Sequence, residues 1–135
     1  MINYQITPEW QLQLDQPYSR RVEAGQLVLW TSGRTILAAV FNCRGKRKML
    51  LAQLKAKAAD SKLEIFESKS GQLQRFGYLQ TEEVRDGHTR LALHAFTTTP
   101  TSCLQTAFYL DLASDLPWAI QAWEGITYTP TQERA

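Results

Sequence analysis

Short turn-forming residue pairs interrupt the chain at close intervals and separate segments in which apolar and polar residues alternate. The pairs are Ala24-Gly25, Ser32-Gly33, Ser70-Gly71 and Asp86-Gly87, and a Thr-Pro-Thr sequence surrounds Pro100. Glycine reaches the positive backbone angles that tight hairpin turns need, so this pattern predicts strands joined in antiparallel hairpins. The segments with strand-like composition are residues 10–15, 26–30, 35–42, 62–68, 72–84, 88–98 and 102–112.

Two segments have helical spacing instead. Leucines and alanines recur at helical intervals within residues 46–59, in a composition that favours helix over strand. A second helix is predicted to follow Ala-Ser-Asp, with Ser114 or Asp115 as its cap, Pro117 in its first turn and Gly125 at its end. The order of these elements predicts an α+β fold, in which two principal helices pack on a single antiparallel sheet of about seven strands.

The chain is expected to form one domain, residues 1–135, with loosely held ends at residues 1–8 and 129–135. Its composition, with 44% hydrophobic and 21% charged residues, is ordinary for a globular protein. The first residues show neither a basic leader nor an apolar run of signal length, and the longest apolar stretch, residues 36–41, is too short to span a bilayer. We therefore expect a soluble, cytoplasmic protein without membrane insertion.

The sequence contains no recognisable catalytic or metal-binding motif. Cys43 and Cys103 lack the spacing of a disulfide framework or a zinc site. His88 lies beside a predicted turn and His94 lies within a strand, and neither belongs to a hydrolase or metalloprotease motif. A thiolate pair between Cys103 and His94 on neighbouring strands is the enzymatic alternative. We predict that the protein is not an enzyme and uses no metal or cofactor.

Basic residues are concentrated in the first predicted helix. Six of the 15 lysines and arginines lie between Arg44 and Lys57, and the rest of the chain has nine basic against 13 acidic residues. On a helix these charges diverge to both flanks of the leucine stripe, which favours a solvated helix edge. The charge asymmetry leaves open an alternative, in which the start of the helix binds an anionic ligand or nucleic acid. The candidate residues for this alternative are Arg44, Lys46, Arg47 and Lys48, although a P-loop pattern and interleaved aromatic residues are absent.

One face of the predicted sheet combines aromatic and polar side chains. Strand alternation places Phe76 and Tyr78 on one face and His94 and Phe96 on one face, and Tyr109 of a neighbouring strand can join them. If both helices cover the opposite face, these residues remain available to a protein partner or a second copy of the chain. A second core layer is the structural alternative. Protein binding is therefore the leading hypothesis, and nucleic-acid binding is the second.

The order of the elements also resembles a known fold. A strand-rich start, a helix after residues 34–42, a long meander, and a closing strand and helix in residues 103–126 are similar to the PsbP-like fold. That fold is shared by the photosystem extrinsic protein PsbP, a nuclear Ran-release factor, and small bacterial proteins that include the effector-associated chaperones of type VI secretion. The resemblance implies a non-enzymatic adaptor or chaperone-like role and transfers no individual site residue.

Overall fold

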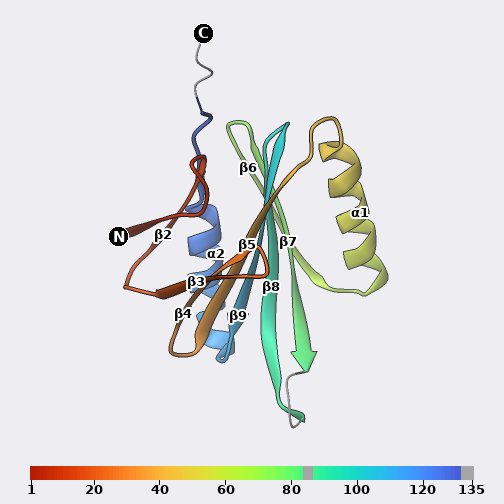
Figure 1. Ribbon diagram of the computed structural model, residues 1–135. Coiled ribbons are helices and arrows are strands. Elements are labelled where there is room, and N and C mark those ends of the chain that lie inside the picture. Colours follow the sequence, from red (N-terminus) through yellow and green to blue (C-terminus); the bar gives the residue numbers. More distant parts are fainter. Residues whose placement is uncertain (84–86, 132–135) are drawn as a thin grey trace.

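The computed structural model describes residues 1–83 and 87–131 and has an α+β architecture (Figure 1). Helix α1 spans Arg47–Asp60, and helix α2 spans Leu116–Glu124 after a 3₁₀ turn, η2, at Ala113–Asp115. The strands are β1 (Ile2–Gln5), β2 (Trp10–Leu14), β3 (Ser19–Glu23), β4 (Gln26–Thr31), β5 (Arg34–Asn42), β6 (Glu64–Ser70), β7 (Leu73–Glu83), β8 (Thr89–Thr98), β9 (Ser102–Leu110) and β10 (Thr127–Tyr128). The predicted fold class is confirmed.

The strands form two sheets, so the prediction of a single sheet is wrong. The large sheet has seven strands in the order β3-β4-β5-β9-β8-β7-β6, and all neighbours in it are antiparallel. Strands β6 to β9 form the predicted meander. The small sheet has three strands in the order β1-β2-β10. Alternation within a strand predicts that one side is buried, but it does not specify which sheet the strand joins.

Strand β2 has clear alternation and lies at the centre of the small sheet. Its residues Trp10, Leu12 and Leu14 are at most 1% exposed and pack in one hydrophobic cluster with residues of the large sheet. Residues 2–5, which were expected to be loose, form β1 and pair with β2 instead. Of the C-terminal segment that was expected to be loose, residues 132–135 lie outside the described residues.

Helix α2 and the small sheet together cover one face of the large sheet. Ala119, Ala122 and Trp123 of α2 are buried, and the Trp123 indole Nε1 donates a hydrogen bond to Thr97 Oγ1 of β8 at 2.9 Å. These side chains close the main hydrophobic core. The large sheet contributes to this core the buried residues Leu27, Leu29, Ile36, Ala38, Leu93, Ala95, Leu104, Phe108 and Leu110.

The ends of α2 lie where the sequence predicted them, with Pro117 in the first turn and Gly125 directly after the last helical residue. The side chain of Asp115 occupies the cap position but makes no capping hydrogen bond. Its carboxylate oxygen Oδ1 accepts a hydrogen bond from Arg34 Nη2 at 3.0 Å, and the guanidinium of Arg34 lies 4.4 Å from the ring centre of Trp118. This ion pair fixes the start of α2 against β5.

Helix α1 packs on the opposite face of the large sheet from α2 (Figure 1). Its leucine stripe and Ala58 contact a second, smaller core. The strand pairing places Phe76 directly opposite Phe96 and Tyr78 opposite His94, which provides the aromatic surface for the helix. The expectation that both helices cover one face is therefore wrong. The members of this core are Cys43, Ala58, Phe76, Tyr78, Phe96 and Cys103, with Leu50, Leu51, Leu54 and Leu63 packed against them.

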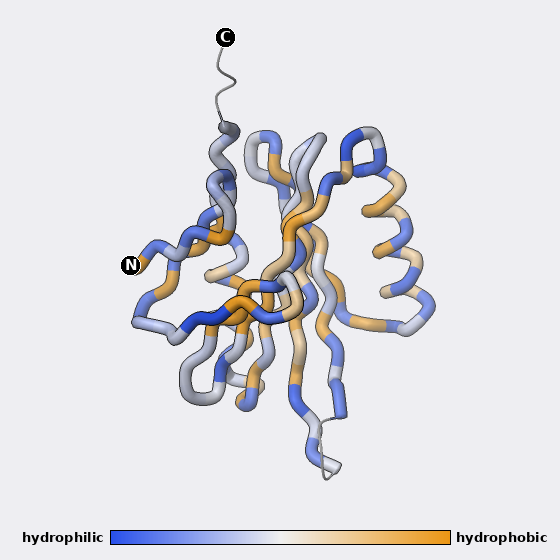
Figure 2. The backbone as a smooth tube through the Cα atoms, viewed as in Figure 1, coloured by the Kyte–Doolittle hydropathy of each residue, from blue (hydrophilic) through white to orange (hydrophobic). Residues whose placement is uncertain are grey.

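Hydropathy follows these layers. Hydrophobic stretches are concentrated in the strands at the centre of the molecule, and most hairpin turns are neutral to hydrophilic (Figure 2). In residues 1–83 and 87–131, no helix combines the length and the apolar character needed to cross a membrane.

Candidate functional site

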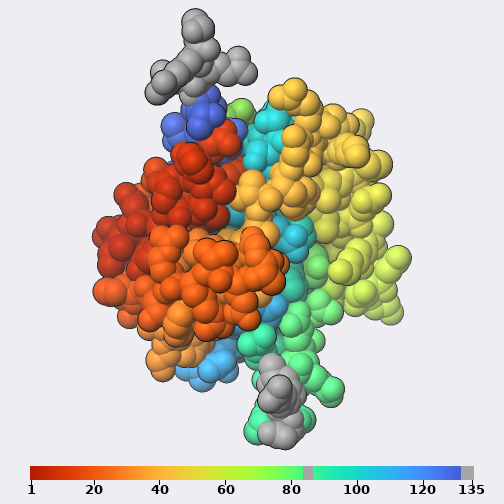
Figure 3. Space-filling model, viewed as in Figure 1, coloured from red at the N-terminus to blue at the C-terminus, as the bar shows by residue number. Residues whose placement is uncertain are grey.

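Helix α1 covers only part of its face of the large sheet, and a groove lies beside it. Two adjoining cavities of about 110 and 240 Å³ form this groove and share Gln26, Leu37 and Tyr109 in their walls. The helix and the β3–β4 hairpin stand on either side of a strip of the sheet (Figure 3). We call this region the open groove. Its other lining residues are Arg21, Glu23, Ala24, Val28, Thr35, Ala38, Ala39, Arg90, His94, Gln105 and Ala107.

The β3–β4 hairpin forms one wall of the open groove because it crosses in front of the large sheet (Figure 1). Ala24 and Gly25 in its turn have φ angles of 50° and 78°, and two successive positive φ angles give the turn the twist of a tight hairpin. The hairpin shields Val28 of β4, which is 5% exposed. All residues of β3 itself are exposed. This strand therefore lacks apolar alternation and was not predicted.

The cavity of about 110 Å³ is the narrow end of the open groove, and the cavity of about 240 Å³ is its wide end. The floor of the narrow end consists mainly of small and apolar side chains. In the strand pairing, Leu37 of β5 lies opposite Ala107 of β9, and Ala107 lies opposite His94 of β8. Ala39 and Gln105 form the next pair along the same strands. Paired residues of neighbouring strands share one face of a sheet, so these side chains all point to the side that carries α1. The small side chains of Ala39 and Ala107 leave space above the sheet.

His94 is the centre of a polar and aromatic cluster between the open groove and α1. Its Nε2 lies 2.7 Å from Glu82 Oε1, and its side chain is 16% exposed. The imidazole centre is 5.2 Å from the ring centre of Tyr78 and 6.4 Å from that of Tyr109. Lys57 of α1 donates a hydrogen bond to the Tyr78 hydroxyl at 3.4 Å. The carboxylate of Glu82 thus fixes the imidazole at the edge of the groove.

Arg90 stacks on Tyr109 at the wide end of the open groove. The guanidinium carbon lies 3.9 Å from the ring centre, within the range of a cation–π contact. Burial of the ring and the negative charge of Glu82 raise the pKa of Tyr109, and the charge of Arg90 offsets part of this rise. Tyr109 is therefore a neutral phenol at physiological pH and can donate a hydrogen bond.

Arg21 makes a similar contact on the hairpin wall. Its guanidinium carbon lies 4.8 Å from the ring centre of Trp30, and its Nε donates a hydrogen bond to Glu23 Oε2 at 2.8 Å. The side chains of Arg21 and Glu23 are 57% and 61% exposed. Water competes for such an ion pair, so it contributes little to stability. The wide end is thus lined by two arginines that each stack on an aromatic ring. The carboxylate of Glu23, which binds Arg21, can be replaced by another carboxylate.

The structure brings together three of the five residues that the sequence predicted for partner binding. His94 and Tyr109 line the open groove, and Tyr78 contacts His94 from beneath α1. Phe76 and Phe96 are 1% and 5% exposed. These two phenylalanines belong to the core under α1, so the expectation that they lie on an uncovered surface is wrong.

Arg47, one of the predicted anion-binding residues, is occupied by structural contacts. Its Nη2 donates hydrogen bonds to the carbonyl oxygens of Gln72 at 2.6 Å and Thr98 at 3.0 Å, and its Nε donates to Thr98 Oγ1 at 3.0 Å. Burial lowers the pKa of Arg47 from its ordinary value. The side chain joins the first turn of α1 to the ends of β7 and β8.

The other basic side chains of α1 diverge as the helical geometry predicted. Lys55 Nζ lies 3.0 Å from Glu67 Oε1 of β6, whereas Lys57 reaches Tyr78 on β7. The basic side chains of α1 therefore do not converge on one site along the length of the helix. The remaining candidates at its start, Arg44, Lys46 and Lys48, are exposed.

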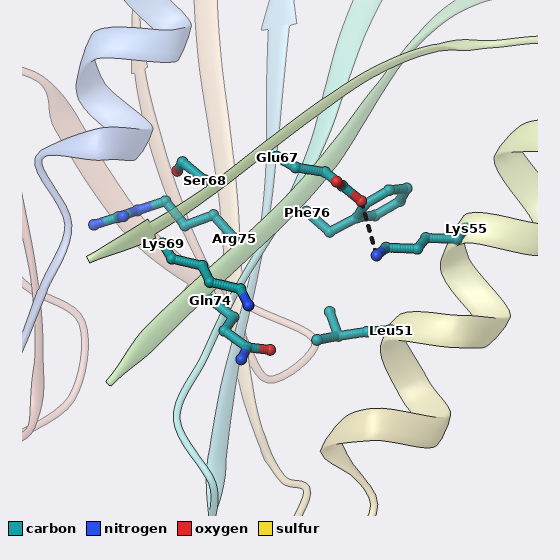
Figure 4. A pocket seen from close by; sticks show the side chains of 8 residues that line it. All are labelled: Leu51, Lys55, Glu67, Ser68, Lys69, Gln74, Arg75 and Phe76. Carbon is teal, nitrogen blue, oxygen red and sulfur yellow. Dashed lines mark ion pairs between the residues drawn. The ribbon is translucent and has the colours of Figure 1, made fainter. Parts of the chain in front are cut away.

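A separate cavity of about 220 Å³ lies between α1 and the β6–β7 edge (Figure 4). Lys55 and Glu67 form an ion pair across it. Arg75 points away from α1, and its Nη2 donates to the carbonyl oxygen of Glu124 in α2 at 3.3 Å. Because several of its polar groups already bind protein atoms, this cavity is a weaker candidate than the open groove.

Cys103 and His94 do not form a nucleophile–base pair. His94 lies opposite Ala107, whereas Cys103 lies opposite Thr98, about 13 Å farther along the strands. Burial, with a smaller contribution from Cys43, raises the pKa of the Cys103 thiol to about 12. The thiolate is therefore scarce at neutral pH. Across the described ranges 1–83 and 87–131, His, Cys, Asp and Glu form no group of three or more that could hold a metal ion.

No protein-family model matches the chain, and no curated protein matches it either. The resemblance to PsbP-like proteins therefore stays a prediction.

Proposed function

We propose that the protein is a small, non-enzymatic binding module that holds an extended segment of a partner protein in the open groove. The observation that carries this proposal is the uncovered strip of the large sheet beside α1, with Leu37, Ala39 and Ala107 on its floor. Elsewhere on that face α1 covers the core around Phe76, Tyr78 and Phe96, and the opposite face carries α2 and the small sheet.

The form of the open groove favours an extended chain over a compact ligand. The two cavities adjoin across β4, β5, β9 and β8, so the groove is elongated. Apolar floor residues alternate with polar groups such as Gln26, Thr35 and Gln105, which can donate or accept hydrogen bonds. An extended peptide presents side chains and backbone groups with a similar alternation.

The PsbP-like resemblance supports the same class of role, because it implies an adaptor or chaperone-like protein. A second copy of this chain is an alternative occupant of the groove. A measurement of the solution mass over a range of protein concentrations distinguishes it from a different protein, because only self-association depends on the concentration of this chain alone.

A second candidate function is the binding of an anionic ligand or nucleic acid at the start of α1. Arg44, Lys46 and Lys48 are exposed there, and the first turn of the helix contains no acidic residue. Charge reversal at Lys46 and Lys48 should abolish binding through this surface and leave binding in the open groove intact. Such binding should also weaken steeply with added salt.

The proposal is tested by capturing a partner from the native cell extract, identifying it by mass spectrometry and reconstituting the complex from purified proteins. The double variant Leu37→Gln, Ala39→Arg places polar and bulky groups on the groove floor at two partly exposed positions. Its complex should be lost. The matched control is Leu112→Gln, which changes a leucine that is 62% exposed and lies outside the groove lining.

Equal affinity of the partner for the wild-type protein and the groove variant would contradict the proposal. A complex that is insensitive to the groove variant but is lost on charge reversal at Lys46 and Lys48 would support the second candidate instead. Amide NMR spectra of each variant verify that the fold is retained.

A further inference from the structure

We propose that the wide end of the open groove binds a single carboxylate of the docked segment, between Arg90 and Arg21. This inference rests on the proposed function of the groove and adds the chemistry of its partner: an acidic residue that follows apolar residues in an extended peptide. The wide end is the cavity of about 240 Å³, lined by both arginines and floored by Val28, Leu37 and Tyr109.

Arg90 has the geometry of a carboxylate receptor. Its guanidinium lies 3.9 Å above the ring of Tyr109, and stacking on a ring leaves the N–H groups directed outward in the guanidinium plane. Its Nε is buried and has no hydrogen-bond partner among residues 1–83 and 87–131. A buried donor that lacks an acceptor is unfavourable, and a carboxylate that binds in a bidentate manner supplies two acceptors.

The nearest acidic residue on the paired strand does not satisfy Arg90. Glu82 lies directly opposite Arg90 in the β7–β8 pairing, but its carboxylate oxygen is 2.7 Å from His94 Nε2. Within residues 1–83 and 87–131, no carboxylate lies within ion-pair distance of Arg90. The bond between Glu82 and His94 therefore leaves a position in front of Arg90 for an external carboxylate.

Arg21 supplies a second cation on the opposite wall of the cavity. Its present partner, Glu23, is exposed, and water competes for that ion pair, so the guanidinium can bind an incoming carboxylate at small cost. The carboxylates of Glu23 and Glu82 also limit the positive charge of the wide end. They favour one negative charge over a polyanion, which distinguishes this site from a nucleic-acid surface.

The floor of the cavity defines the surroundings of the carboxylate. Val28, Leu37 and Tyr109 present apolar atoms beneath the two arginines, and the narrow end continues with Ala39 and Ala107. In an extended chain, residues two apart point to the same side. The preferred segment therefore has apolar residues at alternate positions, followed by an acidic residue at the next position on the same side.

The test uses a defined pair of peptides with blocked ends. The first, acetyl-Leu-Thr-Leu-Thr-Glu-Thr-amide, places two leucines and one glutamate on one side, and the second has glutamine in place of glutamate. Each is titrated to millimolar concentration against isotope-labelled protein while the amide NMR spectrum is recorded. We expect the glutamate peptide to shift the amides of Val28, Leu37 and Tyr109 and to bind about tenfold more tightly than the glutamine peptide.

Arg90→Gln should reduce the affinity for the glutamate peptide by about tenfold, to the level of the glutamine peptide. Arg90→Lys keeps the charge but removes the planar fork, so its affinity should lie between those of the wild-type protein and Arg90→Gln. Lys48→Gln, which removes one positive charge on α1, is the matched control and should bind the glutamate peptide normally. The amide spectrum of each variant shows directly whether it is folded.

Three results would overturn the inference. If the two peptides bind equally well in the groove, the carboxylate site is wrong while the groove remains a peptide-binding site. If the glutamate peptide shifts residues at the start of α1 and loses affinity in Lys48→Gln, the acidic group binds elsewhere. If neither peptide shifts the groove residues, the proposed ligand chemistry is wrong, and reconstitution with the captured partner decides the proposed function separately.

Discussion

Replacing Gly77 by alanine should lower the stability of the protein because Trp123 occupies the space that the new methyl group needs. Gly77 lies in the middle of β7, on the face that α2 covers. A Cβ atom at this position would lie 2.8 Å from Trp123 Cη2, 3.1 Å from Trp123 Cζ3 and 3.1 Å from the carbonyl oxygen of His94. Carbon atoms in ordinary contact are about 3.5–4.0 Å apart. The indole or the strand must therefore move.

Neither of them can move freely. Trp123 is 2% exposed, and its Nε1 donates a hydrogen bond to Thr97, which is fully buried. Overpacking of a core costs about 1–3 kcal/mol, and loss of the indole hydrogen bond would add about 1 kcal/mol. Replacing a strand glycine by alanine stabilises the folded state by about 0.5–1 kcal/mol, because it reduces the backbone entropy of the unfolded chain. We expect a net loss of about 2 kcal/mol from the free energy of unfolding.

Urea unfolding, followed by both tryptophan fluorescence and far-ultraviolet circular dichroism, measures this loss. For 135 residues the entropy of unfolding is about 0.28 kcal/mol/K, so a loss of about 2 kcal/mol should lower Tm by about 7 °C. Gly125→Ala is the control. Gly125 has a φ angle of −82°, and a Cβ there would meet its nearest atom, the carbonyl oxygen of Gln121, at 3.4 Å. This substitution should change stability by less than about 0.5 kcal/mol.

A double-mutant cycle shows whether the tryptophan causes the loss. Phenylalanine at position 123 lacks the outer atoms of the indole, so Gly77→Ala should cost clearly less in a Trp123→Phe background than in the wild-type protein. Equal costs in both backgrounds would attribute the strain to the His94 carbonyl. A stability of Gly77→Ala within about 0.5 kcal/mol of the wild-type value would show that neither the indole nor the His94 carbonyl oxygen opposes a methyl group at this position.

Two further predictions concern single side chains. Arg47→Ala should lower the free energy of unfolding by about 1–2 kcal/mol, because it removes hydrogen bonds to Gln72 and Thr98. Lys48→Ala, at an exposed position, should leave stability unchanged in the same urea assay. Equal effects of the two substitutions would show that the hydrogen bonds of Arg47 do not stabilise the fold. Folding raises the pKa of the Cys103 thiol to about 12. The neutral buried thiol therefore contributes fully to stability below the pKa that this thiol has in the unfolded chain, and the contribution falls as pH rises above about 9. Between pH 9 and 10 the wild-type protein should lose about 1 kcal/mol more than Cys103→Ala, and parallel pH profiles would contradict this assignment.

The sequence predicted the elements whose signals are local. The helix predicted over residues 46–59 is observed at Arg47–Asp60, and the turn pairs at Ser32-Gly33 and Ser70-Gly71 do separate strands. These features depend on residues a few positions apart, such as a leucine stripe or a glycine with a positive φ angle. The strands β1, β3 and β10 were not predicted, because they are short or fully exposed and bury too few apolar side chains to form a pattern.

The candidate site could be predicted only in part for the same reason. The grouping of Tyr78, His94 and Tyr109 was predicted from alternation along their strands, and these strands prove to be neighbours. No sequence signal identified Arg21 or Arg90 as residues of the site. Arg21 reaches Trp30 within the β3–β4 hairpin, and Arg90 reaches Tyr109 across the β8–β9 pairing, so both contacts depend on a strand register that alternation does not specify.

The α+β class, the two helices and the meander follow from the amino-acid sequence, because periodicity and turn chemistry act over short distances along the chain. The placement of α1 and α2 on opposite faces of the large sheet, and of β2 in a second sheet, depends on contacts between residues far apart in the chain. An apolar stripe specifies that a surface is buried but not which partner buries it. That choice buries Phe76 and Phe96 under α1 and leaves the open groove beside them.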